Sequence, residues 1–205
     1  MIRKIFLATK NQAKIQRFKN LLNQAGLNVE INTPGDFGLE NIDPEENGKD
    51  LAENAEIKAR AYFGKVSIPI LSNDTGFWVE NEGLIDTPKR AGLNGKDEKS
   101  LTEKEVSEAL LKFWKNIAKK HGGKVNAAWM EEFVLLKPDG KKRVARSKRE
   151  VILTNREFGT PHIQMPIRSL YISKTTNKPA IQHTKEEEFI ELKPIINALK
   201  KILSE

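Results

Sequence analysis

Cysteine is absent from all 205 residues of the chain, so disulfide bonds, zinc–thiolate sites and thiol catalysis are excluded. Long apolar runs are absent too, since each is the length of a strand and falls well short of the roughly 20 residues that a membrane-spanning helix needs. The apolar stretch from Ile5 to Ala8 is too short for a signal peptide, and we expect it to form a first strand instead. We therefore expect a cytoplasmic protein that does not bind membranes.

Histidine is scarce, and the common nucleotide-binding loops are missing. The three histidines, His121, His162 and His183, are scattered without the spacing of metal ligands, and we expect them to be structural or exposed. The sequence contains no Gly-x-x-x-x-Gly-Lys motif and no Gly-x-Gly-x-x-Gly after a strand. A P-loop and a Rossmann-type dinucleotide site are therefore excluded.

Charge is plentiful and unbalanced, with 35 basic and 28 acidic residues and a net charge of +7. This excess suits a nucleic-acid binder and equally suits an enzyme for small polyanions, so charge alone does not decide between them. Residues 141–149 carry six of the basic side chains on one expected hairpin. A solvated hairpin face accounts for them most simply, and we do not expect nucleic acid to be the partner, although such binding would use this segment.

The hydrophobic pattern predicts an α/β fold with a parallel N-terminal half and a hairpin-rich C-terminal half. The expected strands lie at residues 2–8, 27–31, 68–72, 77–80, 125–136, 144–154 and 170–173. The expected helices run from an Asn11 N-cap to residue 25, over 51–63, and over 102–118 behind a Thr102–Glu105 capping box. Thr184 is expected to cap a first acidic turn, and the last helix is expected from Pro194 onward. We expect residues 73–76 to form a turn and 81–101 to form a long loop.

The first group of residues with chemical potential lies at the first strand-to-helix turn. A helix N-terminus offers free backbone N–H groups and a partial positive charge, which suit a phosphate. Thr9, Asn11 and Lys14 place a hydroxyl, an amide and an ammonium over that turn. Alternatively, Asn11 only caps the helix while Lys10 and Lys14 are only solvated.

Two further groups carry carboxylates. Glu46 stands in an acidic, Gly-containing loop before the second helix, and Lys58 lies one helical turn beyond Asn54. Asp74 follows the apolar strand 68–72, and ligands of open α/β sheets bind at the carboxyl ends of strands. These carboxylates suit Mg²⁺, although a solvated acidic loop and a plain Asx-turn would explain the same residues.

In this order and at this spacing, the three groups resemble the inosine triphosphate pyrophosphatase family, which removes non-standard purine nucleoside triphosphates. The family motif Ser/Thr-x-Asn-x-x-Lys is matched by residues 9–14. Its Glu-Thr-Gly and Glu-Asn-Ala-x-x-Lys-Ala stretches are matched by residues 46–48 and 53–59, and its Asp-Asp-Ser-Gly-Leu motif by residues 73–77. The matches cover residues 1–80 and are specific as a set.

The resemblance implies an elongated two-lobed α/β fold with a long, twisted mixed β-sheet flanked by helices and an active-site cleft between the lobes. Residues 1–205 would form this single domain without a separable linker, and family members are usually homodimers. The implied reaction is Mg²⁺-dependent hydrolysis of a (d)NTP, such as ITP or XTP, between the α- and β-phosphates, giving the monophosphate and pyrophosphate.

The resemblance also implies roles for individual residues. Asp74 would activate the attacking water. The triphosphate would be held by Thr9, Asn11, Lys14 and Lys58. The metal would be held by Glu46, Asp74 and Asn73, which has an amide where the family has the first aspartate of its pair.

The C-terminal third departs from the family pattern. The base-binding Phe-Gly-Tyr-Asp-Pro segment corresponds to His162–Pro166, which keeps only the proline, and the purine-reading Ser-His-Arg falls at Leu192–Pro194. Glu188 replaces a lysine, and Arg90 stands at the Ser-Ala-Arg position. The triphosphate half is therefore kept and the base half is altered. The alternative function is a non-catalytic descendant that binds nucleotides or nucleic acid, and a third is hydrolysis of another phosphorylated metabolite.

Overall fold

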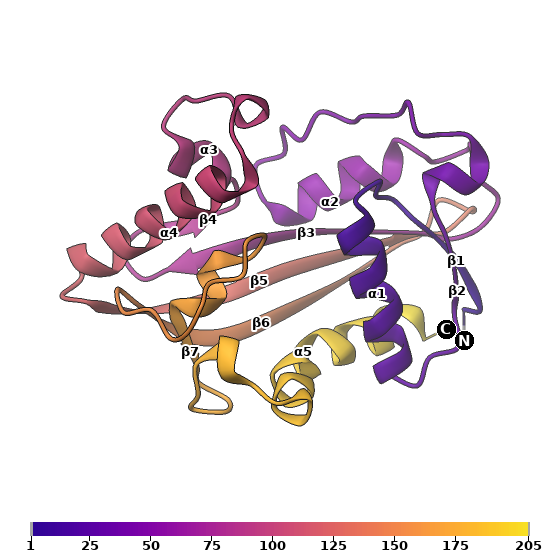
Figure 1. The fold of residues 1–205 in the computed structure, drawn as a ribbon. Coiled ribbons are helices and arrows are strands. Elements are labelled where there is room, and N and C mark those ends of the chain that lie inside the picture. Colours follow the sequence, from indigo (N-terminus) through magenta and orange to yellow (C-terminus); the bar gives the residue numbers. More distant parts are fainter. Residues whose placement is uncertain (1, 205) are drawn as a thin grey trace. The chain divides into compact units, whose positions relative to one another are not determined.

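The computed structural model describes residues 2–204, with only the backbone described for Lys89 and Arg90 (Figure 1). Within that range no helix combines the length and the apolar character needed to span a bilayer. The chain divides into two compact units, each made of segments that are distant in sequence. Unit 1 comprises Met1–Thr75, Met130–Lys148 and Lys193–Glu205, and unit 2 comprises Gly76–Trp129 and Arg149–Leu192.

Within residues 2–204, seven strands form one mixed sheet in the order β2-β1-β3-β5-β6-β7, with β4 paired to β3. The strands are β1 (Lys4–Leu7), β2 (Glu30–Asn32), β3 (Ile70–Val79), β4 (Gly83–Ile85), β5 (Lys124–Leu136), β6 (Lys142–Thr154) and β7 (Tyr171–Ser173). The helices are α1 (Gln12–Gln24), α2 (Leu51–Arg60), α3 (Pro88–Leu93), α4 (Glu103–Lys120) and α5 (Lys185–Leu203). β1 runs parallel to β2 and β3, whereas β4 and β7 run antiparallel to their partners. The predicted α/β fold with a mixed sheet flanked by helices is confirmed.

In unit 1, helices α1 and α2 cover opposite faces of the sheet. Successive side chains of a strand alternate between its two faces. Val134 of β5 belongs to the buried cluster that contains Ala55 and Ala59 of α2. The neighbouring Phe133 instead meets Phe18 of α1 edge to face, with ring centroids 6.2 Å apart. Helices α1 and α2 therefore cover the two faces of the same part of the sheet (Figure 1).

In unit 2, helix α4 packs on the sheet through an apolar stripe. Thr102 and Glu105 form the predicted capping box, in which the Glu105 N–H donates to the Thr102 hydroxyl oxygen at 3.2 Å. The stripe then buries Trp114 against Phe77 of β3, with ring centroids 5.2 Å apart. The predicted hairpin between β5 and β6 also forms, since the Lys137 N–H donates to the Lys141 carbonyl at 2.9 Å.

The expected turn at residues 73–76 is wrong, because β3 continues without interruption from Ile70 to Val79. The Asn-Asp-Thr-Gly sequence favours a turn only through weak local preferences. β3 lies between β1 and β5 in the sheet and pairs with β4 near its end, and this backbone pairing outweighs local preference. The side chains of residues 72–75 therefore follow strand alternation and not turn geometry.

Two other expectations are corrected. The region 81–101 is not one long loop, because it contains β4, α3 and a short 3₁₀ turn at Glu98–Ser100. The last helix begins at Lys185 and not at Pro194, which lies inside α5. The predicted cap at Thr184 does form, and it sets the start of this helix. The Thr184 N–H donates to a Glu187 carboxylate oxygen at 3.0 Å, and the Glu187 N–H donates back to the Thr184 hydroxyl oxygen at 3.3 Å.

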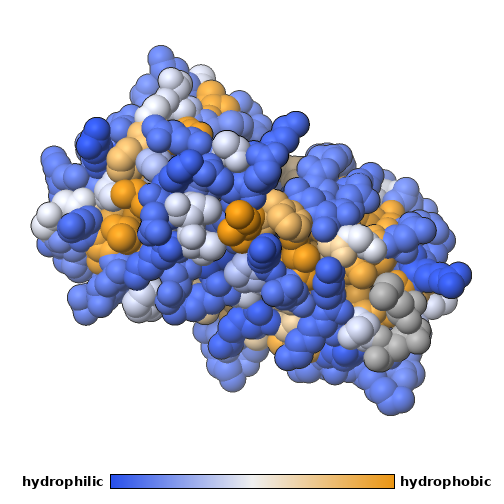
Figure 2. All heavy atoms as spheres, turned by 90° about the horizontal axis from the view of Figure 1, so that it is seen from below, coloured by the Kyte–Doolittle hydropathy of each residue, from blue (hydrophilic) through white to orange (hydrophobic). Residues whose placement is uncertain are grey.

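The molecular face in Figure 2 is mostly hydrophilic, with apolar residues exposed among the hydrophilic ones. Such scattered apolar residues are normal on a protein surface.

Candidate functional site

Lys58 lies at the centre of the predicted site, in unit 1. Its Nζ lies 2.7 Å from Oδ1 of Asp74 in β3 and 2.8 Å from Oε2 of Glu46 in the loop before α2. Lys58 and Asp74 are each buried, with 8% of their surface exposed, whereas the Glu46 side chain is about half exposed. The structure thus brings the lysine and both carboxylates of the prediction into direct contact.

The position of Glu46 is fixed by the start of α2. The Asp50 side chain caps this helix by accepting the Glu53 N–H at 2.9 Å. Buried Asn54 reaches back from the helix and accepts the Gly48 N–H at 2.9 Å. A Cβ at Gly48 would lie only 2.8 Å from the Asn54 side-chain oxygen, so a glycine is required there. This role of Asn54 is not among the predictions from the sequence, although Asn54 lies in the matched Glu-Asn-Ala stretch, which marks the position.

Strand alternation separates the side chains of Asn73 and Asp74. The Ser72 hydroxyl donates to the Ala55 carbonyl of α2 at 2.5 Å, which places residues 72 and 74 on the α2 face. The Asn73 side chain points to the opposite face, where its amide donates to the Thr75 hydroxyl oxygen at 3.2 Å. The structure therefore does not bring the Asn73 side chain to the two carboxylates. Only its backbone carbonyl contacts Lys58, 3.4 Å from Nζ.

The N-terminus of α1 carries the remaining predicted residues. The Asn11 side chain accepts the Lys14 N–H at 3.0 Å, which confirms the predicted N-cap. The Asn11 N–H itself donates to the Thr9 hydroxyl oxygen at 3.2 Å. Lys10 points away to a surface ion pair with Asp43 at 2.9 Å. The first turn of α1 therefore presents backbone N–H groups and Lys14 beside an ordered Thr9–Asn11 turn.

Electrostatics link α1 to the carboxylate cluster. Burial lowers the pKa of Lys14, and the positive charge of Lys58 lowers it further, while Asp74 and Glu46 act in the opposite direction. The pKa of Lys14 therefore depends on the charges of all three residues. We refer to Lys14, Glu46, Lys58 and Asp74 as the charge cluster; it has two positive and two negative groups.

The donor set of the charge cluster fits a hard divalent cation. Among residues 2–204, no group of three or more His, Cys, Asp or Glu side chains is placed to hold a metal ion. Mg²⁺, however, is commonly bound by one or two carboxylates, with water and substrate phosphates completing its shell. Glu46 and Asp74 share one ammonium partner and so supply two neighbouring carboxylates of that kind.

The altered base-reading segment is exposed at residues 162–165 and buried only at Pro166, while Glu188 and the neighbouring Glu191 of α5 make polar contacts in unit 2. Glu188, which replaces a family lysine, accepts a hydrogen bond from Arg168 at 3.0 Å. Glu191 lies 3.1 Å from both Arg149 and His183.

The expectation of a structural or exposed role holds for His183, whose side chain is 1% exposed. The His162 ring nitrogen Nδ1 accepts a hydrogen bond from the Gln164 N–H at 3.2 Å. The side chain of Arg90 lies outside the described part of the chain.

Most basic side chains of residues 141–149 have acidic or carbonyl partners. Lys141 pairs with Asp139 at 2.9 Å, Lys142 with Glu56 at 2.5 Å, and Arg146 with Glu132. The expectation of a solvated face is wrong for Arg149, which pairs with Glu191 and lies over the Trp129 ring, 5.8 Å from its centroid. These pairings reduce the positive charge that the segment would offer to a polynucleotide.

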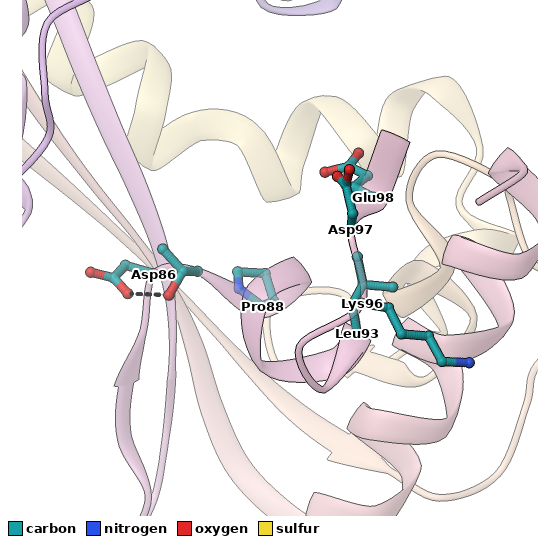
Figure 3. A pocket seen from close by; sticks show the side chains of 7 residues that line it. Asp86, Pro88, Leu93, Lys96, Asp97 and Glu98 are labelled. Atoms are coloured by element: carbon teal, nitrogen blue, oxygen red, sulfur yellow. Dashed lines mark hydrogen bonds between the residues drawn. The ribbon is translucent and has the colours of Figure 1, made fainter. Parts of the chain in front are cut away.

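A cavity of about 610 Å³ in unit 2 contains none of the predicted site residues. It is lined by Asp86, Thr87, Pro88, Leu93, Lys96, Asp97 and Glu98. Figure 3 shows that the ammonium end of Lys96 points away from the carboxylates of Asp97 and Glu98, while the Thr87 hydroxyl donates to Asp86 at 3.2 Å. Its polar groups do not converge on a common point, so it offers no rival site.

A helix start with free N–H groups, the buried Lys58 and two neighbouring carboxylates on a mixed α/β sheet are typical of a phosphate-handling class of protein. A family model described as the Ham1 family matches residues 5–158, and the chain therefore belongs to the Ham1 family. This confirms the relationship predicted from the motifs.

Individual relatives agree with this assignment. A dITP/XTP pyrophosphatase of Corynebacterium glutamicum strain R is 30% identical over 151 residues, which cover 72% of this chain and 68% of that protein. The enzyme of the same name from Haemophilus influenzae is 36% identical over 112 residues, 53% of this chain and 54% of that one. A HAM1 protein of Coxiella burnetii has the same fold, with a TM-score of 0.75 at 17% identity and coverage of 98% of each chain.

Proposed function

We propose that this protein is a divalent-metal-dependent nucleoside triphosphate pyrophosphatase that converts a (d)NTP to the monophosphate and pyrophosphate. Non-standard purines such as ITP and XTP are the proposed substrates, in line with the names of the relatives. The observation that carries the proposal is the contact of Lys58 with both Glu46 and Asp74, beside the α1 N-terminus. We further propose a cytoplasmic homodimer in which residues 1–205 form the single catalytic domain.

The proposed triphosphate contacts come from two helices. The free N–H groups in the first turn of α1 would donate to a bound anion, and the positive end of the helix dipole would attract it. Lys14 adds a charge whose pKa is already lowered by burial, so a bound phosphate would compensate that cost. Thr9 and Asn11 order the turn, and Lys58 supplies a second ammonium. Such an arrangement does what phosphoryl chemistry requires, namely positioning and charge neutralisation.

Glu46 and Asp74 are the proposed carboxylate ligands, and Mg²⁺ bound there would supply charge neutralisation for the phosphates and acidify a bound water. Asp74 would accept the proton of the attacking water, because it is the more buried of the two carboxylates and reaches the site from a rigid strand. The Asn73 side chain would contribute only indirectly, since it lies on the other face of β3.

A relaxed base choice is proposed for the same enzyme. The family residues that would hydrogen-bond the purine are replaced at His162–Pro166 and Leu192–Pro194. A site without those donors loses most of its ability to reject other bases. The non-catalytic alternative is less well supported, because the basic side chains of residues 141–149 are largely paired and the carboxylates are kept.

Pyrophosphate release, measured with Mg²⁺ across inosine, xanthosine, guanosine, adenosine and pyrimidine triphosphates, tests the proposal. We expect Glu46→Gln and Asp74→Asn to lower turnover at least about 100-fold, which is the usual effect of losing an acid–base group or a metal ligand. Glu45→Gln is the matched control, since its side chain is exposed, and it should leave turnover unchanged. If the folded protein releases no pyrophosphate from any nucleotide and binds polynucleotides in a salt-dependent manner, the non-catalytic alternative is correct.

A further inference from the structure

All three N–H donors of Lys58 are already in use. A lysine ammonium has three hydrogens and no acceptor capacity. The partners of Lys58 are Asp74 at 2.7 Å, Glu46 at 2.8 Å and, more weakly, the Asn73 carbonyl at 3.4 Å. Lys58 therefore cannot donate to a phosphate in this arrangement unless it gives up one of these contacts.

The two strong partners of Lys58 are the same two carboxylates that we propose as metal ligands. An ammonium and a divalent cation cannot both lie within about 3 Å of the same oxygens without strong like-charge repulsion. Lys58 also sits in a buried site with an exposed fraction of 8%, where solvent screening of that repulsion is weak. From this geometry we infer that Lys58 competes with the divalent cation for Glu46 and Asp74; this inference rests on the proposed function.

Charge balance links the competition to nucleotide binding. The charge cluster is neutral as it stands, with Lys14 and Lys58 opposite Glu46 and Asp74. A divalent cation alone would add two uncompensated positive charges beside two ammonium groups. A triphosphate supplies the missing negative charge and gives a displaced Lys58 new acceptors. Metal and nucleotide therefore bind cooperatively, and Lys58 passes from the carboxylates to a phosphate.

The competition is tested with Mn²⁺ alone, without nucleotide, by following the loss of the free-ion electron paramagnetic resonance signal during titration. We expect Lys58→Met to bind Mn²⁺ at least about tenfold more tightly than the wild type, within the usual range of coupling between ligands. Adding Glu46→Gln to Lys58→Met should abolish the gain, which places the ion at this carboxylate. Lys49→Met is the matched control, because it removes the same charge from an exposed pair with Glu53 and should change affinity by less than about twofold.

A measurement on the wild type covers the case in which Lys58→Met does not fold. Ammonium signals of hydrogen-bonded lysines can be followed by ¹⁵N NMR, and Lys58→Arg assigns the one that matters. Addition of Mg²⁺ with a non-hydrolysable triphosphate should shift this signal, whereas Mg²⁺ alone should shift it only at much higher concentration. An unshifted Lys58 signal at saturating metal and nucleotide would overturn the inference, as would equal or weaker Mn²⁺ binding by folded Lys58→Met.

The outcomes separate the inference from the proposed function. Wild-type turnover without tighter Mn²⁺ binding by Lys58→Met would reject the competition and leave the enzyme assignment intact. Tighter Mn²⁺ binding by that variant in a protein that hydrolyses no nucleotide would support the competition and reject the enzyme assignment.

Discussion

Arg17 of α1 holds both oxygens of the fully buried Glu131 carboxylate of β5, through hydrogen bonds of 2.7 and 2.9 Å. Arg17 lies one helical turn after Lys14, so this ion pair fixes α1, the helix that Asn11 caps, against the sheet. Bidentate guanidinium–carboxylate pairs are among the more strongly oriented interactions in proteins. The pair therefore connects the stability of unit 1 with the placement of its phosphate-binding helix start.

Removal of Arg17 should destabilise the protein strongly. Arg17→Met leaves the Glu131 carboxylate buried without its guanidinium, which costs about 3 kcal/mol of unfolding free energy. Lys19→Met, on the same helix and exposed, should change the unfolding free energy by less than about 0.5 kcal/mol. Urea denaturation of both variants measures the difference.

The double variant Arg17→Met/Glu131→Met provides the second half of this test. Replacing both residues by apolar side chains removes the buried carboxylate charge as well, so the double variant should be more stable than Arg17→Met. A double variant as unstable as Arg17→Met would show that the loss arises from packing and not from the buried carboxylate.

The same ion pair illustrates which features could be predicted from the sequence. The Asn11 cap, the Thr102–Glu105 capping box and the hairpin after Lys137 depend on residues a few positions apart, and all three form as predicted. Arg17 and Glu131 are 114 positions apart, and no local signal marks Glu131 as buried or Arg17 as its partner. Their pairing depends on β5 lying beside β3 in the sheet, which is a tertiary feature.

The residues of the site likewise divide into those that could be predicted from local sequence and those whose placement depends on tertiary structure. The motif spacing led to Lys58, Glu46 and Asp74, which the structure brings together. The orientation of Asn73 could not be predicted, because it depends on whether residues 73–76 form a turn or a strand. A turn would have allowed Asn73 and Asp74 to point the same way, whereas strand alternation sends them to opposite faces.

Asn11→Asp separates the structural role of the N-cap from the proposed role in binding. Aspartate caps helices as well as asparagine does and favours the positive helix end, so the unfolding free energy should stay within about 0.5 kcal/mol of the wild type. The added negative charge faces the proposed triphosphate, and like charges in close contact should raise the nucleotide KM at least about tenfold. Asn11→Ala is the converse control, since it loses the cap and about 1 kcal/mol of stability without adding charge. An unchanged KM for Asn11→Asp would remove the triphosphate from the α1 N-terminus.

Lys14→Met should make the protein more stable and a poorer enzyme. Burial and the nearby Lys58 lower the pKa of Lys14, so its charged form is less favourable in the folded than in the unfolded state. At neutral pH the wild type therefore carries a cost that Lys14→Met removes, and the variant should have the higher unfolding free energy. This excess should shrink as the pH rises from the lowered folded pKa of Lys14 toward the unfolded value of 10.5, because in that window the unfolded state binds more protons and the wild type gains stability.

Loss of the Lys14 ammonium should also raise the nucleotide KM. Higher stability together with weaker nucleotide binding is expected when a binding site is kept at the expense of stability. Urea unfolding at pH 7 and pH 10, paired with pyrophosphate-release kinetics, measures both effects, and a variant that is less stable than the wild type at pH 7 would contradict the assignment of Lys14 as an electrostatically costly phosphate ligand.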